Sequence, residues 1–236
     1  MILLPLADRL KIPSNTGTDN RPAVPMRAPR RDEIASATVG MLRKGGRFKA
    51  DLLLVDLGEG EMVVKDFAGK SGWGRRLGRI QIRRELEAYR WLGKMPGIPA
   101  FIGEVDALAL AVEKVEGQLL HVCRDGRESM EGPVAKLRVL IDHLHGKGVV
   151  HNDLRGRDNL MRRPDGEVVL LDLAGAICLA PGGLAHRVFF RWLAKTDDSA
   201  YLKWKEYLTP GRLTPEEKAF LRRFRIRRRM WPFNRK

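Results

Sequence analysis

Two acidic residues and an amide follow short apolar runs in one part of the chain. Asp153 comes after Val149-Val150, Asn159 follows in the same segment, and Asp172 ends the apolar run 168–171. Carboxylate and amide oxygens are ligands that suit Mg²⁺. Phosphoryl transfer needs such groups, because catalysis rests on orienting the attacking hydroxyl and on holding magnesium against the phosphates. We therefore predict that Asp153 orients an acceptor hydroxyl and that Asn159 and Asp172 bind the metal.

The same segment also fits a purely structural β-hairpin. Asp165-Gly166 is a turn sequence between the apolar residues Leu160-Met161 and the run 168–171. In that alternative the acidic side chains are merely solvated. The hairpin fits both alternatives, so other groups upstream must decide between them.

A lysine and a glutamate upstream supply such groups. Residues 61–67, which follow the turn Gly58-Glu59-Gly60, are predicted to form a strand that carries Lys65. A helix is predicted over the next segment, because four apolar residues recur at helical spacing: Ile82, Leu86, Tyr89 and Leu92. Glu85 lies within this apolar stripe, whereas Glu87 points away from it. Since a carboxylate on an apolar face needs a buried cation, we predict that Glu85 pairs with Lys65.

In this order the motifs resemble the protein-kinase-like fold and, within it, the lipopolysaccharide kinases of the Kdo-kinase type, with RIO-type kinases as more distant relatives. The resemblance covers roughly residues 37–205 and is carried by Lys65, Glu85, Glu113, Val115, His151, Asp153, Asn159 and Asp172. It implies an α+β, two-lobed fold with a small antiparallel-sheet N-lobe, a mainly helical C-lobe and a reduced activation segment.

The resemblance also implies ATP and Mg²⁺ as cofactors and assigns roles to individual residues. Lys65 would position the nucleotide phosphates, and backbone groups near Glu113 and Val115 would hydrogen-bond adenine. Arg155 or Arg157 would neutralise charge on the transferred group.

Two departures concern the nucleotide and metal contacts. No G-x-G-x-x-G precedes Lys65, so only Gly45-Gly46 can bend over the phosphates, and a simple turn is the alternative. The interval from Asp153 to Asn159 is one residue longer than in most kinases, which leaves open whether Asp158 takes over part of the role of Asn159.

Two further departures concern control and substrate. Asn152 follows His151 where kinases commonly have arginine, and the segment after Asp172 is short and lacks Ala-Pro-Glu. We therefore expect an enzyme that needs no activation-loop phosphorylation and has no docking platform for a peptide.

Length and composition predict one substantial core shared by two small lobes about one cleft. We expect a flexible Pro-rich arm over 1–33, the N-lobe over 34–116, the C-lobe over 117–221 and a basic aromatic tail over 222–236. Asp198 or Ser199 is expected to cap one C-lobe helix, and Thr214, with Glu217 three residues later, to start the last one. Without a signal peptide or an apolar run that could cross a bilayer, we expect a cytoplasmic protein. The two cysteines, Cys123 and Cys178, are expected to be reduced thiols.

The net charge of +15 is concentrated in two places. Residues 222–236 carry eight cations, three aromatics and no acid. A second cluster surrounds the start of the predicted helix, where glycines should loosen the segment: Lys70, Arg75, Arg76, Arg79, Arg83 and Arg84. Such a tail suits an anionic membrane surface, with nucleic acid or a solvated tail as alternatives.

Together these patterns predict an ATP- and Mg²⁺-dependent phosphotransferase. With the resemblance, the acceptor is expected to be a hydroxyl of a lipid-linked saccharide at the inner face of the cytoplasmic membrane. A RIO-like protein serine/threonine kinase is the first alternative. A pseudokinase or scaffold that uses its cleft for binding alone is the second.

Overall fold

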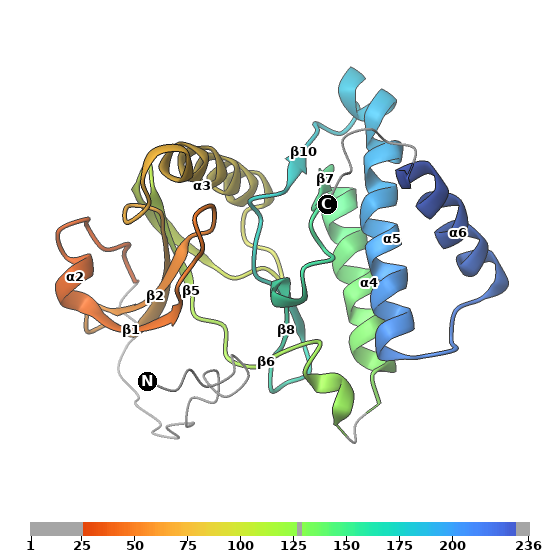
Figure 1. Cartoon of the computed structure of the whole chain (residues 1–236), viewed down its shortest axis with the longest axis horizontal. Coiled ribbons are helices and arrows are strands. Elements are labelled where there is room, and N and C mark those ends of the chain that lie inside the picture. The colour runs from red at the N-terminus through yellow and green to blue at the C-terminus, as the bar shows by residue number, and fades with distance from the viewer. Residues whose placement is uncertain (1–25, 127–128, 230–236) are drawn as a thin grey trace. The chain divides into compact units, whose positions relative to one another are not determined.

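A computed structural model describes residues 26–126 and 129–229 of the chain. The chain divides into two compact units, Met1–Gln118 and Leu119–Lys236, called here the N-terminal unit and the C-terminal unit (Figure 1). This boundary lies just after the division at Glu116-Gly117 that the sequence predicts.

The N-terminal unit is built on a five-stranded antiparallel sheet. Its strands are β1 (Thr38–Arg43), β2 (Asp51–Asp56), β3 (Glu61–Asp66), β4 (Phe101–Asp106) and β5 (Ala109–Glu113), in the order β1-β2-β3-β5-β4. The sheet and the helices of both units confirm the predicted α+β class.

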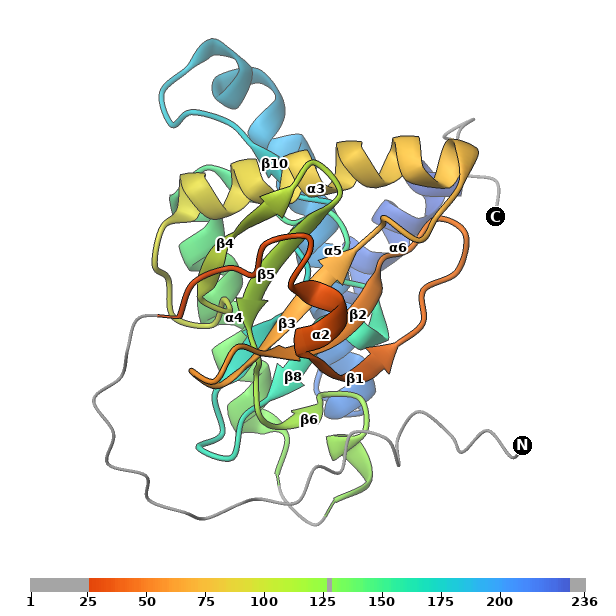
Figure 2. The same cartoon turned by 90° about the vertical axis from the view of Figure 1, so that its left-hand side faces the viewer.

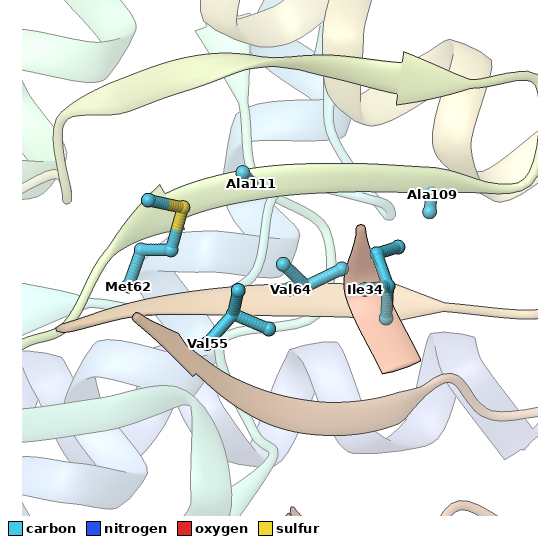
Figure 3. Close-up of a cluster of buried hydrophobic side chains, with 6 residues drawn as sticks. All are labelled: Ile34, Val55, Met62, Val64, Ala109 and Ala111. Carbon is cyan, nitrogen blue, oxygen red and sulfur yellow. The ribbon is translucent and has the colours of Figure 1, made fainter. Parts of the chain in front are cut away.

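Alternate residues of β3 point to opposite faces of the sheet. On one face Met62 and Val64 join a buried cluster with Val55, Ala109, Ala111 and Ile34 of the short helix α2 (Ile34–Ala37; Figure 3). Lys65 points to the other face. The long helix α3 (Gly72–Leu92) lies along that face (Figure 2), and its Glu85 contacts Lys65 there.

The structure corrects our prediction that glycines loosen the segment before the helix. The helix begins at Gly72, and Gly74 and Gly78 are buried within it. A Cβ at Gly78 would lie 2.4 Å from the Phe67 ring, and one at Gly74 would lie 2.3 Å from the Arg47 carbonyl oxygen. These glycines therefore let the helix approach its neighbours closely.

Residues 26–33, expected to be part of a flexible arm, lie against the sheet. Arg31 donates two hydrogen bonds of 2.7 Å to the Asp106 carboxylate and a third of 2.7 Å to Asp66. These hydrogen bonds hold the pKa of the Asp106 carboxyl below its usual range. Charge pairing therefore orders a segment whose composition alone predicts flexibility; residues 1–25 lie outside the described residues.

Three helices form the bulk of the C-terminal unit. They are α4 (Glu131–Gly146), α5 (Arg191–Leu208) and α6 (Pro215–Arg229), and α5 packs against both of the others (Figure 1). The connecting elements are β6 (Gln118–Leu119), η1 (Cys123–Asp125), β7 (Val149–Val150), η2 (Arg157–Asn159), β8 (Leu160–Arg162), β9 (Val168–Leu170), β10 (Ile177–Cys178) and η3 (His186–Phe190). Strand β7 pairs with β10, and β8 pairs with β9.

Several local predictions for this unit can be compared with the structure. The hairpin of β8 and β9 is confirmed, and Gly166 in its turn has a φ of 81°. The capping box is also present, because the Thr214 hydroxyl accepts the Glu217 N–H at 3.3 Å and the Glu217 carboxylate accepts the Thr214 N–H at 2.8 Å. Cys123 and Cys178 are both free thiols.

One other prediction for this unit is wrong. No helix starts at Asp198 or Ser199, because α5 runs without a break from Arg191. The last helix extends to Arg229, so residues 222–229 of the predicted tail are helical, and 230–236 lie outside the described residues. Within the described part of the chain, no helix is both long enough and apolar enough to cross a membrane.

Candidate active site

In the N-terminal unit, Lys65 and Glu85 form a buried ion pair. The Lys65 ammonium bonds to Glu85 Oε1, and the two residues are only 8% and 2% exposed. Glu87 is exposed and lies 3.5 Å from Arg83 instead. The helical spacing thus selected the correct glutamate. Removing either side chain of such a buried pair destabilises the fold, because the remaining charge stays buried without a partner.

The Gly45-Gly46 loop is closed by a second ion pair. Asp51 accepts the Gly45 N–H at 2.7 Å and the Lys70 ammonium at 2.7 Å, and Lys70 also bonds to the Gly45 carbonyl at 2.9 Å. A Cβ at Gly45 would lie 2.2 Å from the carbonyl oxygens of Lys49 and Ala50, so only glycine fits there. A phosphate bound by the Gly45 amide would have to replace the Asp51 carboxylate. At Gly46 there is open space, because a Cβ there would meet nothing within 4 Å.

The predicted adenine-binding backbone lies at the end of β5. The Glu113 N–H donates to the Ala100 carbonyl at 2.8 Å, and the Glu113 carboxylate accepts the Ala100 N–H at 2.9 Å. Strand β5 ends at Glu113, and Val115 follows it in a segment without regular structure. Lys114 pairs there with Glu61 and, at 2.7 Å, with Glu116.

In the C-terminal unit, His151 links the other predicted residues. Its ring is fully buried, and Nε2 bonds to the Asp172 carbonyl while Nδ1 accepts the Asp153 N–H at 3.2 Å. A carbonyl oxygen can only accept, so Nε2 carries the hydrogen and Nδ1 does not. The neutral imidazole therefore joins the backbone of Asp153 to that of Asp172.

Asn159 lies beside Asp153. Its amide nitrogen donates to the Asp153 carbonyl at 2.8 Å and approaches the Asp153 carboxylate at 3.3 Å. The amide oxygen Oδ1 can therefore act as a ligand for a cation. A Cβ at Gly156 would lie 2.7 Å from the Asn159 amide nitrogen, so the glycine makes room for this side chain.

The hairpin brings Asp172 close to Asn159. Leu171, directly before Asp172, donates its N–H to the Asn159 carbonyl at 2.8 Å. The Asp172 carboxylate accepts the Ala174 N–H at 2.9 Å. Next in the chain, Gly175 is so close that a Cβ there would lie 3.2 Å from the Asp153 Cβ. The three residues predicted from their order in the sequence are thus neighbours in one unit.

Asp197 is a site residue that our sequence reasoning missed. It is fully buried in α5, and its carboxylate accepts the N–H of His151 at 2.7 Å and the N–H of Asn152 at 2.8 Å. His145 Nε2 lies 3.1 Å from the same carboxylate. Asn152 has a φ of 65°, a left-handed conformation that asparagine tolerates. Asp197 therefore holds the loop that carries Asp153, and no local pattern in the sequence signals this role.

The two arginines after Asp153 contact helices of the C-terminal unit. Arg155 donates to the Ser199 hydroxyl at 2.6 Å and lies 5.7 Å from the Phe224 ring centroid. Arg157 lies 5.2 Å from the Tyr207 ring centroid. The predicted role of either guanidinium on a transferred group stays a prediction, since these contacts leave N–H groups of both side chains without a described hydrogen bond.

The donor set fits magnesium held mainly by phosphates. No group of three or more His, Cys, Asp or Glu side chains suited to a metal exists within residues 26–126 and 129–229. Mg²⁺ commonly uses one or two protein oxygens together with phosphates and water. Asn159 and Asp172 match that requirement, and no complete protein cage is needed.

Comparison with known proteins gives one informative similarity. No protein-family profile matches the chain. The chain is 27% identical over 176 residues to a protein of Methanoculleus marisnigri named "Probable bifunctional tRNA threonylcarbamoyladenosine biosynthesis protein". The match covers 71% of this chain and 32% of that protein, so the chain spans about a third of its relative's length. This distant similarity is consistent with a kinase-like fold and gives no support to membership of the lipopolysaccharide kinases.

Proposed function

We propose that the chain is a kinase-like phosphotransferase that uses ATP and Mg²⁺ and is closer to RIO-type kinases than to lipopolysaccharide kinases. The observation that carries the proposal is the convergence of Asp153, Asn159 and Asp172 around the His151 ring. A solvated hairpin would not need a buried histidine to join its two acidic segments.

Each residue has a role that its surroundings permit. Asp153 is exposed, so its carboxylate can accept a hydrogen bond from an acceptor hydroxyl and orient it for attack. Asn159 Oδ1 and the Asp172 carboxylate would hold Mg²⁺, which when bound lowers the charge on the phosphates. Lys65, held by Glu85, is assigned to the phosphates by the resemblance, as is adenine binding to the backbone near Glu113 and Val115.

For the acceptor, the comparison favours the alternative over our first expectation. The relative's name refers to tRNA modification, and neither a saccharide nor a membrane partner has support. We therefore propose a protein serine or threonine hydroxyl as acceptor and a role connected with tRNA modification. A scaffold that binds nucleotide without transferring phosphate is the second candidate, favoured by the engagement of the Gly45 amide with Asp51.

Transfer of labelled phosphate tests the proposal. The purified chain is incubated with Mg²⁺ and γ-labelled ATP, with protein extracts and lipid-linked saccharides as acceptors. We expect Asp153→Asn and Asp172→Asn to lower turnover by about a hundredfold or more. Asp165→Asn is the matched control, because Asp165 is an exposed carboxylate whose side chain bonds to the Glu167 N–H in the hairpin turn.

The outcomes separate the candidates. Unchanged turnover in both variants would refute the assigned roles. Nucleotide binding without turnover in the unaltered chain would favour the scaffold. Label in saccharide but not in protein would restore the lipid-linked acceptor.

A further inference from the structure

The N-terminal unit has a basic surface with exposed aromatic rings that the proposed chemistry does not use. It is formed by the connection between β1 and β2 and by the first turns of α3, which lie side by side (Figure 2). The Gln81 side chain donates to the Phe48 carbonyl at 3.2 Å, and Gly74 leaves room for the Arg47 carbonyl. We call these two segments, residues 43–50 and 72–84, the α3 surface.

The positive charge of the α3 surface is not neutralised locally. Neither 43–50 nor 72–84 contains an acidic residue. Arg83 has an ion-pair partner, Glu87, at 3.5 Å. Within the described part of the chain, seven exposed cations of this surface make no ion pair: Lys44, Arg47, Lys49, Arg75, Arg76, Arg79 and Arg84. A polyanion would supply the missing counter-charge.

Two aromatic rings on the α3 surface are exposed, and each is accompanied by an arginine. Trp73 is 63% exposed with the Arg76 guanidinium 5.3 Å from its ring centroid, and Phe48 is 48% exposed with Arg47 at 5.4 Å. A guanidinium covers one face of a ring and leaves the other for stacking. Basic grooves with such rings bind single-stranded nucleic acid, because phosphates contact the cations and bases stack on the rings.

The arrangement on α3 fits a nucleic acid better than a lipid surface. The buried positions of the helix include Gly74, Gly78 and Ile82. The line opposite to them carries Arg76, Ile80 and Glu87, with Trp73 and Arg83 on its two sides, and all five are exposed. A helix that lies in a membrane interface instead presents a continuous apolar face, without charged side chains within it. The exposed apolar residues Trp73, Leu77 and Ile80 share this outward side of α3 with Arg76, Arg83 and Arg84.

We propose that the α3 surface binds single-stranded RNA through its arginines and stacks unpaired bases on Trp73 and Phe48. The choice of RNA over DNA rests on the proposed function, whereas the choice of a single-stranded polyanion rests on the surface itself.

Binding is measured with the full chain and a fluorescent single-stranded RNA of mixed sequence, in the absence of ATP. Arg76→Glu with Arg79→Glu should weaken binding at least about tenfold and reduce the slope of log affinity against log salt by about two. Trp73→Ala should weaken it about tenfold through lost stacking. All three side chains are exposed, so melting temperatures should stay unchanged.

The matched control is Lys94→Glu with Lys203→Glu, which changes the net charge equally at exposed positions outside the α3 surface. An equal loss of affinity in this control would overturn the proposal, as would binding of phosphatidylglycerol vesicles in preference to RNA. Equal binding of a DNA strand of the same sequence would overturn the choice of RNA. Phosphate transfer is not measured here, so the binding result and the proposed function can fail separately.

Discussion

The two groups of candidate residues are held in place in different ways. Lys65 and Glu85 come from a strand and a helix, and each neutralises the other within one buried pair. Asp153 comes from a loop whose backbone is bound by the Asp197 carboxylate, 46 residues beyond His151 in sequence. Regular elements thus position a charge pair by their own periodicity, whereas a loop needs an anchor from another part of the chain.

The strongest test of this contrast is removal of the anchor. Asp197→Ala leaves the buried His151 N–H and its neighbour at Asn152 without their acceptor, so the free energy of unfolding should fall by about 4 kcal/mol. Urea denaturation of the ligand-free chain measures this loss. Asp198→Ala is the control, because Asp198 makes a part-exposed ion pair with Arg138 and should cost less than about 1 kcal/mol. Equal losses in the two variants would show that Asp197 is not the anchor.

A smaller effect is expected from the ion pair of the N-terminal unit. Lys65→Met or Glu85→Leu alone should each cost about 3 kcal/mol, because one buried charge loses its ion-pair partner. The double variant should recover most of this stability, since two apolar side chains replace both charges. Its phosphate transfer should stay as low as that of Lys65→Met. If the double variant recovered phosphate transfer as well as stability, the Lys65–Glu85 pair would have a structural role only.

The smallest effect tests how closely α3 approaches its neighbours. Gly78→Ala should lower the free energy of unfolding by about 2 kcal/mol, because its Cβ would overlap the Phe67 ring. Gly132→Ala is the control, since a Cβ at that helical position meets nothing within 4 Å and alanine favours the helix. Gly78→Ala should therefore lower the melting temperature, whereas Gly132→Ala should raise it. A neutral Gly78→Ala would mean that α3 can move away without cost.

Local patterns predicted the elements that carry most of the candidate residues. The apolar run after a glycine turn placed Lys65 on a strand, and the 3.6-residue stripe selected Glu85 over Glu87. Turn chemistry likewise predicted the β8–β9 hairpin. These signals are local, so a single sequence contains them.

The missing features depend on contacts between distant residues. The role of Asp197 follows from the backbone of His151 and Asn152, which no local pattern reveals. The same holds for Arg31, whose partners Asp66 and Asp106 order a segment that composition marked as flexible. Gly74 and Gly78 were misjudged because their value lies in the space that they leave for Arg47 and Phe67.

The close contact of Gly175 with Asp153 couples the two ends of the candidate site. The His151 ring also joins the Asp153 amide to the Asp172 carbonyl, so neither segment can shift alone. A ligand that orders Asp172 therefore also orders Asp153 in part, which lowers the entropic cost of binding a second ligand at Asp153. By thermodynamic reciprocity, a nucleotide and an acceptor hydroxyl should each raise the affinity for the other by the same factor.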